Sequence, residues 1–396
     1  MKPRAFICLT GNALASAIRH QLEKLRCSSC GKTYTASLGP GVQKYDACLK
    51  ANLAIAKNFM GMPFNRIAQL QKMVGVPLPA STQFELTESL ANDIHIIYKT
   101  LVDLAAQASC TSYDDTWNRV QSITKENKKN PDRERQGVHT TAILSAFENH
   151  KISLFVTGRQ HAGENMNEFL LRRVTSLPPP HVMSDALSSN NLSETLKAVV
   201  FNCLNHGRRK FYEIRDHHQA PCNIVLDTIG LIYHYDAITK AEKMKPKARL
   251  EYHQALSLPL LTSLKGWIQE QFDHKKAEPN SSLGQALRYM LNHWDKLTRF
   301  LHVEGGLLDN NHCEQILKTI IRCRKNSLFY KTEHGANVGC ILTSIIQTCV
   351  LAGENPVHYL VSLQHHKEAM HLNPLLWVPW KYRQQLEGTQ PSLQAA

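Results

Sequence analysis

Two runs rich in β-branched residues, "GVHTTAILSAFE" and "HKISLFVTG", constrain the fold of this chain most strongly. Residues 148–150 join them tightly, so the two runs predict an antiparallel pair. A strand-like run, "ASCTSYDDTW", comes before them, and a charged, Pro-containing loop, "TKENKKNPDRERQ", lies between. After them come an amphipathic helix in "AGENMNEFLLRRV", a short strand in "PPPHVMSDALSS" and a mostly helical stretch, "NLSETLKAVVFNCLNHGRRKFYEI". This order predicts a mixed α/β sheet that opens with a meander and closes with crossovers.

Helical patterns flank this region and also interrupt it. Residues 45–107 predict two short helices, a tight Gly-Val-Pro turn and a longer helix, an arrangement typical of a helix-turn-helix unit. A plain helical bundle fits the same pattern and stays open as an alternative. The long helix should begin at Ser81 or Thr82, with Glu85 completing a capping box. Residues 220–303 predict helices throughout, and the chain after Pro379 reads as irregular.

Charge and cysteine usage limit the partners and the compartment. The formal net charge of +13 over 396 residues favours a polyanionic partner, with nucleic acid before an anionic membrane surface. The 11 cysteines are odd in number and irregularly spaced, which favours reduced thiols in a cytosol over a disulfide framework. No segment approaches the roughly 18–20 uninterrupted apolar residues of a membrane span.

Cys27 and Cys30 form a C-x-x-C in "LRCSSCGKTYTA", shaped like a zinc knuckle. Structural zinc takes four ligands, usually as two such pairs. Neither Cys48 nor His20 completes a second pair, and a lone C-x-x-C is a weak signal for bound zinc.

Acidic residues fall where strands end. Asp114 and Asp115 end the first predicted strand, Asp185 ends the fourth, and Glu314 lies early in a late helix, in "LLDNNHCEQILK". Strand ends at one edge of an open sheet converge on a crevice, so these acids can meet. Carboxylates without Cys or His suit Mg²⁺ or Mn²⁺, and two such ions about 3.5–4 Å apart serve phosphodiester chemistry. Each acid also has a local explanation, as a loop acid or a partner of the helix dipole.

The order of elements is that of the RNase H-like fold, and the motifs narrow the resemblance. The chain resembles transposases of the insertion sequence 66 family, bacterial DD(E)-type enzymes, from about residue 25 to 383. The motifs that carry the resemblance occur in the family's order: "LRCSSCGKTYTA", "MPFNRIAQLQ", "VPLPASTQFE", "YDDTW", "LFVTGRQHAGENMNEFLLRR", "MSDALSSN", "CLNHGRRKF", "EPNSSLGQALRYMLNHWDKLTRFL", "LLDNNHCEQILK", "CRKNSLFY" and "NPVHYLVSLQ".

This resemblance implies roles for named residues. The three catalytic, metal-binding acids fall on Asp114, with Asp115 as the alternative for this first acid, Asp185 and Glu314, holding two Mg²⁺ or Mn²⁺ ions. The resemblance also implies supporting residues around the ligands: Asp115, Asn310 and Asn311. Basic residues expected to bind DNA phosphates are His206, Arg208, Arg209, Lys210, Arg324 and Lys325, whose alternative reading is a solvated basic face. His161, Glu164 and Asn165 fit a helix cap.

The resemblance implies an enzyme that cleaves DNA at the element's ends and transfers the freed 3′-hydroxyl into target DNA. Its partners would be double-stranded DNA, a second copy of the chain and accessory proteins of the same element, in the bacterial cytoplasm at the nucleoid. The start of the chain is shorter than the family pattern, so a truncated copy that only binds DNA and an RNase H-like structure-selective nuclease stay open. The expected organisation is 1–22 atypical segment, 23–44 residual zinc knuckle, 45–107 helical DNA-binding region, 108–345 RNase H-like catalytic domain with a helical insertion at about 220–303, and 346–396 C-terminal helix and tail.

Overall fold

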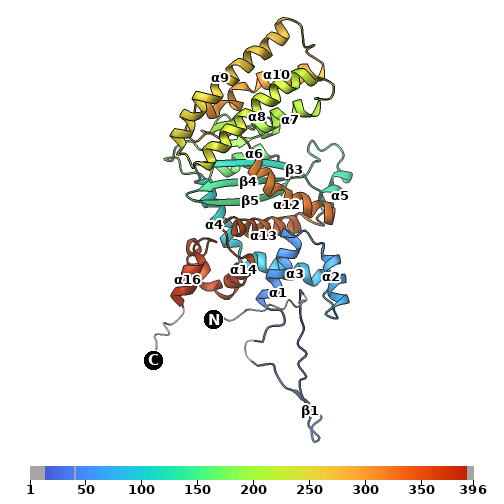
Figure 1. Cartoon of the computed structure of the whole chain (residues 1–396). Helices are drawn as coiled ribbons and strands as arrows, with labels where there is room; N and C mark the ends of the chain where they lie inside the picture. Colours follow the sequence, from blue (N-terminus) through green and yellow to red (C-terminus); the bar gives the residue numbers. More distant parts are fainter. Residues whose placement is uncertain (1–13, 40–41, 390–396) are drawn as a thin grey trace, which may run out of the picture. The chain divides into compact units, whose positions relative to one another are not determined.

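The computed structural model describes residues 14–39 and 42–389. The expected segment 1–22 and the C-terminal tail therefore lie partly outside the described residues. The chain divides into two compact units (Figure 1). The first comprises Met1–Thr100, Arg322–Tyr330 and His334–Ala396, and the second comprises Leu101–Ile321 and Lys331–Glu333.

A five-stranded mixed sheet organises the second unit. Its strands are β3 (Cys110–Trp117), β4 (His139–Phe147), β5 (His150–Gly158), β6 (His181–Ser184) and β7 (Val199–Asn202). The spatial order is β5-β4-β3-β6-β7, with β3, β4 and β5 antiparallel and both β6 and β7 parallel to β3. Glu148 takes a positive φ of 51° in the tight connection that joins β4 to β5. The predicted meander and the crossovers are confirmed.

Two segments of this unit differ from the prediction. Residues 191–214 were expected to be mostly helical, but Val199–Asn202 forms β7, paired along its length with β6, and helix α7 begins only at Leu204. The first half of the expected charged loop belongs instead to helix α5 (Gln121–Lys129), whose Ile123 is buried. In both places burial against the rest of the unit outweighs the local pattern.

Helices lie on both faces of the sheet. Helix α6 (Ala162–Leu170) packs on one face, where the Asn165 amide donates to Thr141 Oγ1 of β4 at 2.8 Å. Helix α12 (Asn311–Ser327) reaches the other face, where the Cys313 thiol donates to the carbonyl of Ala142 at 3.6 Å. Adjacent strand residues point to opposite faces, so Thr141 and Ala142 separate the two helices.

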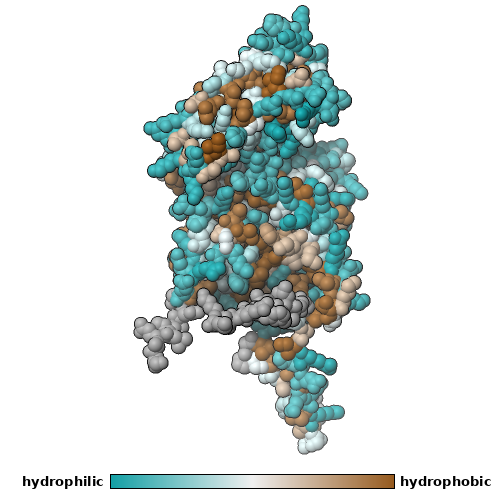
Figure 2. Space-filling view, in the orientation of Figure 1, coloured by the Kyte–Doolittle hydropathy of each residue, from teal (hydrophilic) through white to brown (hydrophobic). Residues whose placement is uncertain are grey.

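The stretch between β7 and α12 is almost wholly helical, as its pattern predicts. Its elements are α7 (Leu204–Glu213), α8 (Gln219–Ala241), α9 (Pro246–Asp273), α10 (Ser282–Asn292), α11 (Trp294–Leu297) and the 3₁₀ turn η3 (Arg299–Leu301). Their inward-facing side chains, including Phe211, Ile229 and Leu287, form one apolar core. Figure 2 shows further apolar side chains on the surface of this helical part, and Ile224 and Leu231 of α8 are exposed.

One buried carboxylate ties two of these helices together. Asp236 of α8 is 1% exposed, and its Oδ1 accepts from Arg249 Nη2 of α9 at 2.8 Å. Lys240 Nζ lies 2.6 Å from Asp236 Oδ2, and His253 Nε2 lies 3.4 Å from Oδ1. Burial alone would raise the pKa of Asp236, but the contacts with His253, Lys240 and Arg249 outweigh it and hold this pKa below its ordinary value.

The described residues of the first unit form helices and one exposed hairpin, β1 (Lys24–Arg26) and β2 (Thr33–Thr35). Its helical elements are α1 (Ala47–Ala54) with the π-turn η1 (Ile55–Phe59), α2 (Phe64–Met73), α3 (Ala80–Asp93), the first half of α4 (His95–Ala106), the end of α12, α13 (Glu333–Leu351), α14 (Pro356–His365), α15 (Lys367–Leu372), η4 (Pro374–Leu376) and α16 (Tyr382–Thr389). Helix α13 has the length and composition of a membrane span, but 72% of that window is buried inside the structure, as in a core helix.

Two predictions for this unit are wrong. Helix α3 begins at Ala80 behind Pro79 and has no side-chain cap, so the expected capping box at Ser81 or Thr82 is not formed. Pro79 occupies the N-cap position itself, and its ring offers no side-chain acceptor for the first helical N–H groups. The tail after Pro379 is not irregular throughout, because α16 follows and buries Tyr382 against Tyr359.

Candidate functional site

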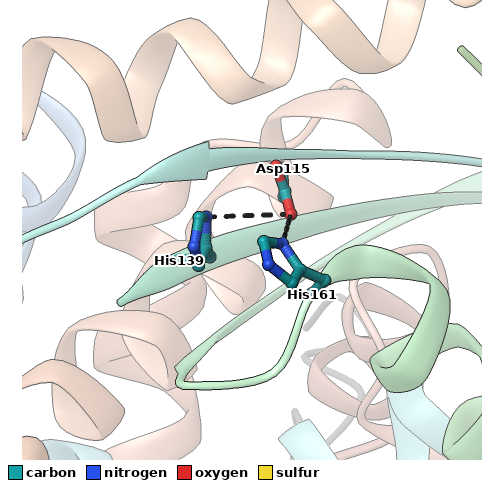
Figure 3. A group of neighbouring side chains, drawn as sticks. All are labelled: Asp115, His139 and His161. Atoms are coloured by element: carbon teal, nitrogen blue, oxygen red, sulfur yellow. Dashed lines mark hydrogen bonds and ion pairs between the residues drawn. The ribbon is translucent and has the colours of Figure 1, made fainter. Parts of the chain in front are cut away.

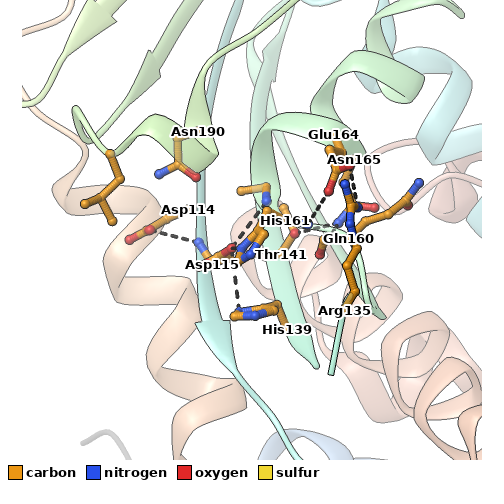
Figure 4. Close-up of polar contacts among 12 residues, drawn as sticks. Asp114, Asp115, Arg135, His139, Thr141, Gln160, His161, Glu164, Asn165 and Asn190 are labelled. Atoms are coloured by element: carbon orange, nitrogen blue, oxygen red, sulfur yellow. Dashed lines mark hydrogen bonds and ion pairs between the residues drawn. The ribbon is translucent and has the colours of Figure 1, made fainter. Parts of the chain in front are cut away.

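The two acids of β3 point to opposite sides of the strand. Asp114 pairs with Ala142 and lies on the face that α12 approaches, whereas Asp115 pairs with Thr141 on the α6 face. Figure 4 shows the two side chains diverging from the strand. Asp114 Oδ1 accepts the backbone N–H of Asp115 at 2.8 Å, which fixes its orientation.

Asp185 follows directly on β6, which runs parallel to β3. It is 8% exposed, and its Oδ1 accepts from the N–H of Leu187 at 3.2 Å and from the side-chain amide of Asn190. The Asn202 amide of β7 donates to the backbone carbonyl of Asp185 at 3.2 Å. The Tyr113 hydroxyl of β3 donates to the carbonyl of Asn190, so the turn η2 (Ser188–Asn190) is bound to the central strand. Strand pairing and four hydrogen bonds thus position this carboxylate.

Glu314 lies in the first turn of α12, and Asn310 attaches that turn to the sheet. Asn310 is 1% exposed, and its amide donates to the carbonyl of Tyr113 at 3.0 Å, next to Asp114. Its backbone N–H donates to Cys203 Sγ at 3.3 Å. Asn311 plays a more local part, because its amide donates to Asp309 Oδ2 at 2.8 Å. The hydrogen bond of Asn310 therefore attaches the turn that contains Glu314 to β3.

The charges of Asp185 and Glu314 both act on the carboxyl group of Asp114. Burial raises the pKa of Asp114 to about 7, and the negative charge of Asp185 acts in the same direction. The N–H of Asp115 opposes the rise, while the charge of Glu314 adds to it. Glu314 Oε1 is buried and has no hydrogen-bond partner among the described residues. Such a cluster of carboxylates is stabilised by a cation placed between them.

Basic side chains border this cluster from α7. His206 Nδ1 lies 3.7 Å from Glu314 Oε1, and Arg209 Nη2 lies 3.5 Å from Glu314 Oε2. Lys210 Nζ sits 4.5 Å from the centre of the Tyr289 ring. A cavity of about 220 Å³ is lined by Asp185, Ala186, Leu187, His206, Arg209, Lys210, Glu213 and Tyr289.

The other expected phosphate-binding residues lie elsewhere. Arg208 lines a separate cavity of about 540 Å³ between α7 and α8. Arg324 and Lys325 occupy the last turn of α12, within the residues assigned to the first unit.

Within the described part of the chain, two groups of side chains have metal-ligand spacing. In one, Cys203 and His206 join Glu314, and neither Asp114 nor Asp185 belongs to a group at this spacing. The other group consists of Asp115, His139 and His161, on the opposite side of β3 from Asp114. Sequence reasoning missed His139 and took His161 only as a helix cap. The register between β3 and β4 brings Asp115 and His139 together, and the spacing of these residues in the sequence does not reveal it.

Cys27 and Cys30 face each other in the turn of the exposed β1–β2 hairpin. The backbone N–H of Cys30 is the main cause that lowers the pKa of the Cys27 thiol, which favours the thiolate that binds metals. No third His, Cys, Asp or Glu joins them at ligand spacing in residues 14–39 and 42–389. Zinc binding here stays a prediction.

Comparison with known protein families decides the membership. The family described as "Transposase IS66 family" matches residues 43–338, about three quarters of the chain. This chain belongs to the IS66 transposase family. The resemblance drawn from the motifs is thereby confirmed, and the match contains Asp114, Asp185 and Glu314.

This IS66-family chain is also similar to three curated proteins of Sinorhizobium fredii. It is 26% identical to the uncharacterised protein y4jD over 162 residues, 25% identical to y4hP over 172 and 27% identical to y4qI over 180. The alignments cover 41–45% of the chain and 31–32% of each relative, so the chain matches about a third of their length.

Proposed function

We propose that this chain is a metal-dependent DNA transposase that cleaves DNA strands at the ends of an insertion sequence and joins the freed 3′-hydroxyl to target DNA. The observation that carries the proposal is that the charges of Asp185 and Glu314, from two segments distant in sequence, both act on the buried carboxyl group of Asp114. Burial and the charges of Asp185 and Glu314 together raise the pKa of Asp114 to about 7. Family membership agrees with this reading.

The topology supports an RNase H-like assignment. Three antiparallel strands are followed by two crossovers to β6 and β7, parallel to the central strand β3. Asp114 lies on that strand, and Asp185 ends its parallel neighbour. We interpret helices α8 to α11 as an insertion placed between the second and third acids.

The donor set fits divalent ions that prefer oxygen. Asp114, Asp185 and Glu314 offer only carboxylate oxygens, and we assign them as ligands of two Mg²⁺ or Mn²⁺ ions. The hydrogen bonds of Asp185 use Oδ1, which makes Oδ2 the natural ligand atom. When bound, such ions activate the attacking oxygen and stabilise the leaving oxygen of a phosphodiester.

The remaining residues of the site orient these carboxylates and bind DNA. Asn190 and the N–H of Leu187 hold Asp185, and Asn310 holds the turn that carries Glu314. Arg209 and Lys210 line the cavity beside Asp185, where their charges would neutralise phosphates. We propose the same role for His206, Arg208, Arg324 and Lys325.

Double-stranded DNA is then the substrate, both as element ends and as target. Two ends must be held at once, so we propose that the active assembly contains at least two copies of the chain, with accessory proteins of the same element as further partners.

A gel assay tests this proposal. Labelled DNA carrying the element's ends is mixed with target plasmid, Mg²⁺ or Mn²⁺ and either the wild-type protein or Asp185→Asn. Joined products should form with the wild type, vanish with Asp185→Asn and persist with Asp273→Asn, which alters an exposed carboxylate at the end of α9. Nicks without joining would instead indicate a structure-selective nuclease. Binding without metal-dependent chemistry would indicate a copy that only holds DNA.

A further inference from the structure

The α6 face of the sheet carries a group of side chains that the transposition chemistry does not use. Asp115 of β3, His139 at the start of β4 and His161 before α6 each offer one ligand atom, and these atoms lie within 4.8 Å of one another. Figure 3 shows both imidazoles turned toward the Asp115 carboxylate. Asp115 Oδ2 is 3.2 Å from His161 Nδ1 and 3.9 Å from His139 Nδ1.

Strand register explains why these residues meet. Asp115 pairs with Thr141, so His139, two residues away in β4, is a diagonal neighbour on the same face. His161 reaches the same point from above the sheet, as the residue that precedes α6. Three elements separated in sequence therefore supply the three ligands.

Supporting contacts hold the ligands in place. The Glu164 carboxylate accepts the backbone N–H of His161 at 3.0 Å, and Arg135 Nη1 donates to Glu164 at 2.6 Å. The N–H of Ala162 donates to Asp115 Oδ2 at 3.3 Å. Figure 4 shows this network beside Asp115. Such outer contacts orient ligands in established metal sites.

The spacing and exposure also fit an ion. Ligands about 2.1 Å from a tetrahedral ion lie roughly 3.4 Å apart, and the two Asp115 distances bracket that value. His139 Nδ1 is buried and makes no hydrogen bond to any described residue. The side chain of His161 is 42% exposed, which leaves a route for an ion and for a water ligand. Two imidazoles and a carboxylate suit ions of the zinc class better than Mg²⁺.

We propose that Asp115, His139 and His161 form a second metal site, separate from the three acids, that binds one Zn²⁺-class ion and ties α6 to β3 and β4. Its ion stabilises the sheet next to Asp114 and takes no part in phosphodiester chemistry. The site stands whether or not the chain proves to be an active transposase.

Zinc binding to the full chain tests the proposal. The parent protein carries Cys27→Ser and Cys30→Ser, which remove the exposed thiol pair, and all metal is first stripped with a chelator. Equilibrium dialysis then compares this parent with His139→Gln/His161→Gln. We expect the double variant to bind one Zn²⁺ fewer, or to bind it at least about 100-fold more weakly.

A matched control removes two exposed histidines elsewhere, as His234→Gln/His358→Gln, and should bind Zn²⁺ like the parent. Equal stoichiometry and affinity in the parent and His139→Gln/His161→Gln would overturn the proposal.

X-ray absorption at the zinc edge, on the parent loaded with one equivalent, decides the case even if that variant does not fold. Two imidazoles and no sulfur support the site. A sulfur ligand would place the ion at Cys203 and His206 and overturn it.

Discussion

Replacing Asn310 by Ala should show how far the position of Glu314 affects activity, apart from any effect on protein stability. The Asn310 side chain is 1% exposed, and its amide donates at 3.0 Å to the carbonyl of Tyr113, one residue beyond the last β3–β6 pair at Ser112 and Met183. Removing this donor leaves the buried carbonyl of Tyr113 without it, which costs about 1–3 kcal/mol of unfolding free energy. The turn that carries Glu314 also loses its attachment to β3, and the loss of such an outer contact lowers metal affinity or activity about 10–100-fold.

Two measurements on the same proteins check this prediction. Chemical denaturation gives the change in unfolding free energy, and the rate of Mg²⁺-dependent strand cleavage gives the change in activity. Asn311→Ala is the matched control, because the Asn311 amide contacts Asp309 and its carbonyl accepts from Asn205 rather than binding the strand. It should cost about 0.5–1.5 kcal/mol and slow cleavage less than Asn310→Ala does. The reasoning fails if Asn310→Ala is destabilised as expected but cleaves DNA at the wild-type rate.

Three further changes test other parts of the structure. Asp236→Asn should lower the unfolding free energy by about 3 kcal/mol at pH 7, since it breaks the buried pair with Arg249. Because the folded-state pKa of Asp236 is depressed, this difference in unfolding free energy should be full above about pH 4 and shrink as the pH falls further. Equal differences in urea unfolding at pH 7 and pH 3 would contradict this prediction. Gly163→Ala would place a Cβ 2.6 Å from the carbonyl oxygen of Asn191, so it should cost about 1–3 kcal/mol, seen as a lower melting temperature, and an unchanged value would be evidence against the tight α6–η2 packing. Arg209→Ala should reduce the slope of log affinity for DNA against log salt concentration by about 0.9 if it removes one phosphate contact. An unchanged slope would show that Arg209 does not contact a DNA phosphate.

The sequence predicts those parts of the fold whose local chemistry and tertiary environment agree. The β4–β5 pair follows from two β-branched runs and a tight connection, and the pairing is as expected. Strand β7 could not be predicted in the same way, because four residues lie directly before α7 and their strand character comes from pairing with β6. Helix α5 was likewise hidden in a charged segment, where a single buried apolar residue, Ile123, holds it against the unit.

For the candidate site, the sequence supplied the residues and the structure supplied their contacts. Asp185 and Glu314 stood out because they fall at a strand end and in a first helical turn within recognisable motifs. Asp114 was also predicted to end its strand, but it lies inside β3, which continues to Trp117. The attachment of Asn310 to Tyr113 spans 197 positions and depends on where β6 ends, so spacing alone could not reveal it. The diagonal pairing of Asp115 with His139 depends on strand register and was missed for the same reason.

Ion-directed backbone cleavage can show whether Asp114, Asp185 and Glu314 jointly hold divalent ions. Fe²⁺ loaded in place of Mg²⁺ and treated with peroxide and ascorbate cuts the chain close to the bound ion. We expect cuts near all three acids, with those near Asp185 and Glu314 suppressed by excess Mg²⁺ and lost in folded Glu314→Gln. Absence of cuts near Asp185 and Glu314 in the wild-type protein, or cuts there that persist in Glu314→Gln, would contradict it.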